Sequence, residues 1–274
     1  MKIYVSADIE GIGCVVRQEQ SSPAGREYAW ARRMMTEEVN AAVKGAFDGG
    51  ATGVVVSDSH NVGLNLIPEE LDERVSLIMG SPRPLTMMEG IDAGFDAAFL
   101  VGYHAMAGTW DSTIVHVFTG RIAGVWMNGN AFGEIGLSAA LAGLFDVPIA
   151  LVTGDDKTIA EADGLLAGIE TAEVKKGIGS YAALCLPPER SRARIYESAR
   201  RAMSRKPEWR SFRIEGEVDL RVRFTTASGA DRAQRMPRVE RIDGNTVRFK
   251  AGDFLEAFKA FNTMADLIEL VQYI

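Results

Sequence analysis

The amino-acid sequence predicts an α/β protein, with a mixed or parallel sheet flanked by helices and a smaller C-terminal α+β lobe. In the first part of the chain, short apolar runs rich in β-branched residues alternate with segments whose apolar residues recur at helical spacing. After Pro187-Pro188, a helical segment is followed by segments in which polar and apolar residues alternate. We therefore expect an α/β domain over residues 1–186. Residues 187–274 are expected to form the smaller lobe and to contribute oligomer contacts.

The strands expected in the first domain are apolar over almost their whole length, as buried strands of a parallel sheet are. They are Lys2–Ala7, Val54–Ser57, Val75–Met79, Ala97–Val101 and Pro148–Thr153. The helices expected there are Arg26–Phe47, which Gly49-Gly50 ends, the short Met87–Gly94, and Glu134–Phe145.

Two further strands of this domain are expected to pair with one another. They are Thr113–Thr119 and Ile122–Met127, and Asn128-Gly129 after them is a tight-turn signal. In the second lobe we expect an arginine-rich helix over Glu189–Lys206, strands within Glu215–Phe224 and Arg238–Lys250, and an amphipathic helix over Asp253–Tyr273.

Composition excludes several classes of protein. Of the 274 residues, 47% are apolar and 24% charged, which is ordinary for a globular chain and excludes a disordered or fibrous one. No apolar run approaches the roughly 18–20 residues needed to cross a bilayer, and Met1–Gly11 lacks the pattern of a signal peptide. Cys14 and Cys185 are too few for a disulfide framework. We expect a cytoplasmic protein with no membrane association.

Charge is unevenly distributed along the chain. Residues 187–250 hold 17 Lys and Arg against 9 Asp and Glu, whereas the other segments hold 13 against 28. A basic stripe can bind nucleic acid, but no aromatic residues are interleaved for base stacking and no nucleic-acid motif occurs. A solvated helix face, or a contact with the acidic part of this or a neighbouring subunit, explains the arginines better. No nucleic-acid partner is expected.

Residues of metal-ligand type follow three of the expected strands. Asp8 and Glu10 come just after the first strand, His60 after the second and His104 after Ala97–Val101. Because ligands bind at the carboxyl ends of the strands in open α/β sheets, these four side chains are expected to converge. Imidazole and carboxylate suit zinc or manganese, and a carboxylate can bridge two cations. The pattern therefore favours a two-metal site, which would make residues 1–186 a metal-binding catalytic domain.

Other candidate residues have simpler interpretations when taken from the residues alone. His116 lies inside the expected strand Thr113–Thr119, which favours a half-buried core histidine. Glu134 begins a helix, where a carboxylate interacts with the helix dipole, and Asp155-Asp156 suits a helix N-cap. Cys14 lies near carboxylates that disfavour its thiolate, so it is interpreted as a packing residue.

The segment Ser6-Ala7-Asp8-Ile9-Glu10-Gly11 resembles the SxDxEG signature of the DppA-type zinc D-aminopeptidase family. The resemblance continues in order over nearly the whole chain. The further matching motifs are Met35-Thr36-Glu37-Glu38, Asp58-Ser59-His60, Gly102-Tyr103-His104-Ala105, Gly133-Glu134-Ile135-Gly136-Leu137 and Gly154-Asp155-Asp156. Each motif is weak alone, but SxDxEG together with DSH and GYHA is a specific combination.

The resemblance implies a metallopeptidase with two Zn²⁺ per subunit in a ring-like homo-oligomer that removes N-terminal D-amino acids, D-alanine above all, from short peptides. Carried over by position, the metal ligands are Asp8 (bridging), Glu10, His60, His104 and Glu134. His116 matches the catalytic histidine, as acid/base or nucleophile, which replaces its interpretation as a core residue. Val117-Phe118 stand where relatives often have small or polar residues, which bears on the substrate pocket.

Two alternatives belong to other functional classes. Another dinuclear-metal hydrolase of amides or esters would keep the same site and differ in substrate. A non-catalytic binding protein would depend on the arginine-rich segment alone, and metal stoichiometry near zero would favour it.

Overall fold

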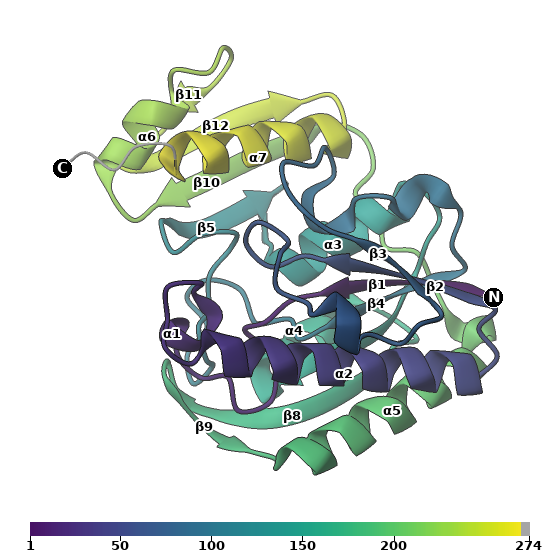
Figure 1. Cartoon of the computed structure of the whole chain (residues 1–274). Coiled ribbons are helices and arrows are strands. Elements are labelled where there is room, and N and C mark those ends of the chain that lie inside the picture. The colour runs from purple at the N-terminus through teal and green to yellow at the C-terminus, as the bar shows by residue number, and fades with distance from the viewer. Residues whose placement is uncertain (270–274) are drawn as a thin grey trace.

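The computed structural model describes residues 1–269, which form two sheets with helices packed around them (Figure 1). The larger sheet has the strand order β3-β2-β1-β4-β7-β8-β9. Its strands are β1 (Lys2–Ala7), β2 (Gly53–Asp58), β3 (Val75–Ile78), β4 (Ala97–Val101), β7 (Ile149–Asp155), β8 (Glu170–Gly179) and β9 (Ala182–Cys185). All neighbours pair in parallel except β8 and β9. The prediction of an α/β fold with a mixed sheet flanked by helices is confirmed.

Both faces of the larger sheet are covered, as a parallel sheet requires. Helices α2 (Tyr28–Asp48) and α5 (Pro188–Ser204) pack against one another and share an apolar core with side chains such as Ile3 and Val5 of β1. The opposite face of the sheet packs against α3 (Glu134–Gly143) and on into the second sheet. The central strands are therefore buried on both faces. The loops at their carboxyl ends, which carry the functional side chains, start from this rigid sheet.

The second sheet is antiparallel and has the order β11-β12-β10-β5-β6. Its strands are β5 (Ile122–Met127), β6 (Asn130–Ala131), β10 (Val218–Phe224), β11 (Glu240–Arg241) and β12 (Thr246–Ala251). The turn predicted at Asn128-Gly129 joins β5 to β6, and both residues have the positive φ that such a turn requires. Helix α7 (Phe254–Glu269), predicted as an amphipathic helix, buries its apolar face on β10 and β12; residues 270–273 of that prediction lie outside the described residues.

The remaining helices are short. They are α1 (Gln18–Ser21), α4 (Asp156–Leu165) and α6 (Ala227–Ala233). Among the described residues, no helix is long and apolar enough to span a bilayer.

Two arginines of α5, and Arg205 just after it, pair with acidic side chains of other elements. Arg192 pairs with Glu37 of α2, and Arg201 and Arg205 both pair with Glu170 of β8. The segment with the highest density of cations is thus partly neutralised within the chain.

The division predicted at residue 187 does not coincide with the division between the two sheets. Helix α5 follows residue 187 but packs on α2 beside the larger sheet, whereas β5 precedes it and pairs with β10 in the second sheet. The chain therefore passes between the two layers more than once. A separate lobe over residues 187–274 stays a prediction.

The strand predicted at Thr113–Thr119 is wrong. Ile114 and Phe118 have φ of 54° and 59°, in the left-handed region that interrupts a strand. The amides of Thr113 and Phe118 bond to the carboxylates of Asp155 and Glu134 rather than to a neighbouring strand. The segment is therefore an irregular connection held by side chains.

The short helix predicted over Met87–Gly94 is also replaced. Two 3₁₀ turns, Thr86–Met88 and Ile91–Ala93, are separated by Glu89 and Gly90, and the φ of 85° at Gly90 precludes one continuous helix.

Candidate metal centre

The register of the larger sheet aligns the ends of three neighbouring strands. Ala7 of β1 lies opposite both Asp58 of β2 and Val101 of β4. The loops that follow therefore start at the same level and carry Asp8 and Glu10, His60, and His104 to one edge. All four side chains are buried or nearly so, with Asp8 only 2% and His104 only 1% exposed. The convergence predicted from the strand ends is what the structure shows.

The loop after β1 is held tightly against its neighbours. A Cβ atom on Gly11 would lie 1.8 Å from the Tyr103 carbonyl oxygen, so only glycine allows this approach between the loops that follow β1 and β4. From the other side, the buried ammonium of Lys175 donates to the carbonyls of Glu10 at 2.6 Å and Ile12 at 3.1 Å. Burial lowers the pKa of Lys175, and Asp155 is the main charge that opposes this shift. This packing fixes the backbone that presents Asp8 and Glu10.

A second buried group, Glu38 of α2, supports the same loop. Its carboxylate accepts hydrogen bonds from the Gly13 amide at 3.1 Å and the Ser191 hydroxyl. Burial raises the pKa of Glu38 to about 7 although these two bonds oppose the shift. Because this pKa exceeds that of the unfolded chain, the contribution to stability is complete at acidic pH and is lost as pH rises through about 7.

We expect Glu38→Gln to relieve this loss, because an amide stays neutral. The free energy of unfolding of the variant, relative to the unchanged protein, should rise by about 2–3 kcal/mol between pH 5 and pH 8. Urea unfolding at the two pH values measures the difference, and Glu37→Gln, at a partly exposed neighbour, is the matched control. A Glu38→Gln variant whose stability follows the unchanged protein at both pH values would show that Glu38 ionises freely.

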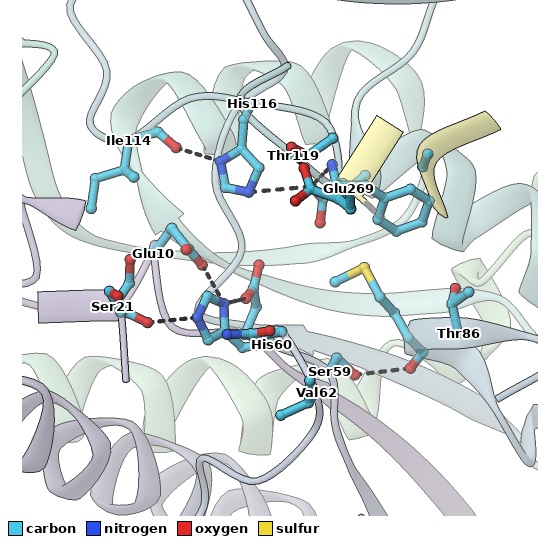
Figure 2. Close-up of a pocket in the computed structure, with 18 of the residues that line it drawn as sticks. Glu10, Ser21, Ser59, His60, Val62, Thr86, Ile114, His116, Thr119 and Glu269 are labelled. Carbon is cyan, nitrogen blue, oxygen red and sulfur yellow. Dashed lines mark hydrogen bonds and ion pairs between the residues drawn. The ribbon is translucent and has the colours of Figure 1, made fainter. Parts of the chain in front are cut away.

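The His60 ring lies between two carboxylates and a backbone carbonyl. Its Nδ1 is 3.3 Å from Asp8 Oδ1 and 3.0 Å from Glu10 Oε2, while its Nε2 donates to the Ser21 carbonyl at 2.8 Å. Figure 2 shows the ring between Glu10 and Ser21. With the proton on Nε2, the lone pair of Nδ1 faces the carboxylates.

His104 repeats this arrangement on the other side of Asp8. Its Nδ1 donates to the Ala105 carbonyl at 3.0 Å, and its Nε2 lies 3.7 Å from Asp8 Oδ2 and 3.3 Å from Glu134 Oε1. Glu134 stands at the first residue of α3, and the Phe118 amide donates to it at 2.6 Å. The two oxygens of Asp8 therefore face two different histidines, as a bridging carboxylate would.

His116 is brought to the same site by the irregular segment described above. Its ring stacks on His104 with centroids 4.1 Å apart, and its Nε2 is 3.7 Å from Glu134 Oε1. Its Nδ1 donates to the Ile114 carbonyl at 2.8 Å, and the ring is turned toward the cavity across from His60 (Figure 2). Burial, and then repulsion from His104, lower the pKa of His116, which favours a neutral ring.

The protein alone does not balance the charges gathered here. Burial, reinforced by the charge of Glu10, raises the pKa of Asp8 to about 7. Burial also disfavours the charged form of His104, but Glu134 outweighs it and raises its pKa to about 10. Among the described residues, His104 Nε2 and Glu10 Oε2 are buried without a hydrogen-bond partner. Buried polar atoms rarely lack a partner unless an ion or water completes the site.

The donor atoms fit divalent zinc. Asp8, Glu10 and His104 offer ligand atoms within 4.8 Å of one another, and so do His104, His116 and Glu134. Imidazole nitrogens and carboxylate oxygens are common zinc ligands, and histidines that bind zinc usually donate their other nitrogen to a carbonyl or carboxylate. His60 and His104 both meet this condition.

A D-aminopeptidase family model matches residues 1–263 of the chain. The chain belongs to the D-aminopeptidase family. It is 35% identical to a D-aminopeptidase of Bacillus subtilis (strain 168), over 97% of each protein. Among solved structures it is similar to the Zn-dependent D-aminopeptidase DppA from Bacillus subtilis, described as a self-compartmentalizing protease, with a TM-score of 0.96, 34% identity and full coverage of both chains.

These matches confirm the predicted family and enzyme class, a zinc metallopeptidase of the D-aminopeptidase type. The structure brings together all six residues singled out in the sequence, namely Asp8, Glu10, His60, His104, His116 and Glu134. Asp155, interpreted as an N-cap, does cap α4 through bonds from the amides of Lys157 and Thr158. Burial, and then Cys185, raise the pKa of Cys14 to about 11, in keeping with a packing role.

Sequence reasoning missed the residues that support the site from a distance. Lys175 and Glu38 hold the loop after β1, and the carbonyls of Ser21 and Ile114 orient two of the histidines. The family motif containing Glu38 was the one available signal for any of them.

Proposed function

We propose that this enzyme releases N-terminal D-amino acids, D-alanine above all, from short peptides through a dinuclear zinc centre. The observation that carries this proposal is the shared orientation of His60 and His104. Each has one ring nitrogen tied to a backbone carbonyl, and the other faces a different oxygen of Asp8. The names of the two Bacillus subtilis relatives support the D-configuration of the substrate.

The proposed ligands divide into two sets that share Asp8. Glu10 and His60 would hold one ion together with Asp8, and His104 and Glu134 would hold the other together with Asp8. Two zinc ions bound there supply Lewis-acid polarisation of the scissile carbonyl and lower the pKa of a bound water toward about 7.

The chain itself supplies the group that moves a proton. The Ile114 carbonyl fixes the proton of His116 on Nδ1, which leaves Nε2 with a free lone pair beside Glu134. A neutral histidine of this kind can take up a proton at Nε2 from the attacking water and return it to the leaving amine. As a nucleophile it would instead bond to the carbonyl carbon and expel the amine, and water would then hydrolyse the acyl group from the ring. The low pKa of the ring keeps it available for either role.

The substrate is expected to enter a cavity of about 770 Å³ that opens beside these side chains. Its walls come from the loops after β1, β2 and β3, from the irregular segment 114–120 and from α7. A volume of this size is typical of sites for small ligands, and it accommodates a short peptide.

Hydrolysis of D-Ala and L-Ala p-nitroanilides, measured in parallel with zinc and with a chelator, tests the proposal. We expect cleavage of the D form alone, abolished by the chelator and restored by zinc. Cleavage of neither compound by protein that holds two zinc ions would contradict it and favour a dinuclear hydrolase of other amides or esters.

We also propose that the chain assembles with copies of itself into a ring-like oligomer, because the DppA structure is described as self-compartmentalizing. Light scattering at micromolar protein should give a multiple of 29.7 kDa, and a mass equal to one chain would contradict assembly.

A further inference from the structure

The cavity beside the metal centre has charge of one sign on most of its walls. Five carboxylates line it, from Asp8, Glu10, Glu134, Asp266 and Glu269. Among the described residues that line the cavity, Arg83 is the one lysine or arginine. Asp8, Glu10 and Glu134 are proposed zinc ligands whose charge the two ions would offset, whereas Arg83 has no part in the proposed metal centre.

Arg83 is fixed in place by the strand next to the centre. One terminal nitrogen of its guanidinium donates to the Ser57 hydroxyl at 3.1 Å and the other to the Asp58 carbonyl at 2.7 Å. A guanidinium has five N–H donors, so these two bonds leave three for a ligand or water. The side chain is half-buried, and no carboxylate among the described residues pairs with it. Its charge is therefore preorganised and not neutralised.

The position of Arg83 relative to the metal centre follows from the chain. The carbonyl that it contacts belongs to Asp58, two residues before His60, and two residues span at most about 7 Å. Figure 2 shows Ser59, His60 and Thr86 on one side of the cavity, with His116 and Glu269 across from them. Since Arg83 contacts the strand end beside Ser59, its guanidinium belongs to the His60 side of the cavity and is anchored two residues from this proposed ligand.

We propose that Arg83 binds the C-terminal carboxylate of the peptide and thereby makes the enzyme selective for peptides of two or three residues. The proposal rests on the aminopeptidase function proposed above and names its substrate class. A short peptide carries a positive amino end and a negative carboxyl end. The zinc-loaded centre would take the amino end as a neutral amine, and Arg83 suits the carboxylate end in the part of the cavity next to His60.

Selectivity follows from what a different peptide presents to Arg83. A guanidinium bonds a carboxylate through charge-assisted, often paired hydrogen bonds, which are stronger than bonds between neutral groups. A C-terminal amide, or the internal amide of a longer peptide, offers only a neutral oxygen at this point. Outside the metal centre, Asp266 and Glu269 repel a substrate anion, so Arg83 is the side chain of this wall that attracts the carboxylate end.

The test compares D-alanylglycine with its C-terminal amide, which has the same length. For the unchanged enzyme, kcat/KM should favour the carboxylate form roughly 10- to 100-fold. In Arg83→Met this ratio should fall to near 1, and Arg83→Lys, which keeps the charge, should restore part of it. Any general damage from losing the bonds to Ser57 and Asp58 affects both substrates alike and cancels in the ratio.

Arg74→Met is the matched control, since Arg74 pairs with Asp72 and is not among the residues lining the cavity. It should keep the ratio of the unchanged enzyme. A ratio near 1 for the unchanged enzyme, or an unaltered ratio in Arg83→Met, would overturn the role of Arg83 and leave the proposed function standing. Hydrolysis of neither substrate by zinc-loaded protein would overturn both.

Discussion

Replacing His60 with alanine should remove one of the two zinc ions and lower kcat/KM by on the order of 10³-fold or more. The His60 Nδ1 faces both Asp8 and Glu10, so the variant lacks the one neutral donor between these two carboxylates. The ion between Asp8 and Glu10 then has one ligand fewer, so the affinity of this site for zinc falls. Zinc content by atomic emission after dialysis, together with turnover of D-Ala p-nitroanilide, measures both effects.

Leu64→Ala is a suitable control for this variant. Leu64 lies in the same connection after β2, but its side chain is 54% exposed and does not line the cavity. It should keep two zinc ions per chain. If His60→Ala also kept two ions and normal turnover, His60 would not be a ligand, and the assignment of the first ion would be wrong.

Replacing His116 with alanine should separate catalysis from metal binding. We expect kcat to fall by roughly 10²- to 10⁴-fold, because the group that moves the proton is lost, while both zinc ions remain. The separation is informative because the His116 Nε2 lies 3.7 Å from Glu134, and the ring forms a possible metal cluster with His104 and Glu134.

Zinc content decides between the two roles of His116. Loss of one ion together with activity would make His116 a ligand and contradict its role in proton transfer. His116→Gln provides a control, since a neutral amide has a similar reach and can still donate to the Ile114 carbonyl. It should keep both ions with equally low turnover.

The strand ends made part of this site predictable. Asp8, Glu10, His60 and His104 follow buried strands whose ends are level in the sheet, so the general rule for open α/β sheets was sufficient to bring them together. The same reasoning predicted the order of strands and helices over most of the first domain. Short apolar runs followed by turn residues mark each strand and its end without any knowledge of tertiary contacts.

The other half of the site could not be predicted from such patterns. His116 lies in a segment with the composition of a strand, but Ile114 and Phe118 take positive φ and the backbone bonds to carboxylates far away in sequence. The local sequence does not indicate which distant carboxylates accept hydrogen bonds from those amides. Only the resemblance to a family assigned His116 and Glu134 to the centre.

Strand β8 was missed for a related reason. Its residues alternate between charged and apolar types, and Lys175 is buried in its middle with backbone carbonyls as partners. A buried lysine is rare unless its charge is compensated, so this segment lacks the continuous apolar run that marks the other buried strands. The loop that compensates this charge follows β1 and contacts Lys175, although the two segments are 165 residues apart in the sequence.

The central claim is that two zinc ions lie on either side of Asp8, and anomalous diffraction from zinc-loaded crystals tests it most directly. Data collected on both sides of the zinc absorption edge should show two peaks, one among Asp8, Glu10 and His60 and one among Asp8, His104 and Glu134. A single peak, or peaks that do not contact Asp8, would contradict the dinuclear centre.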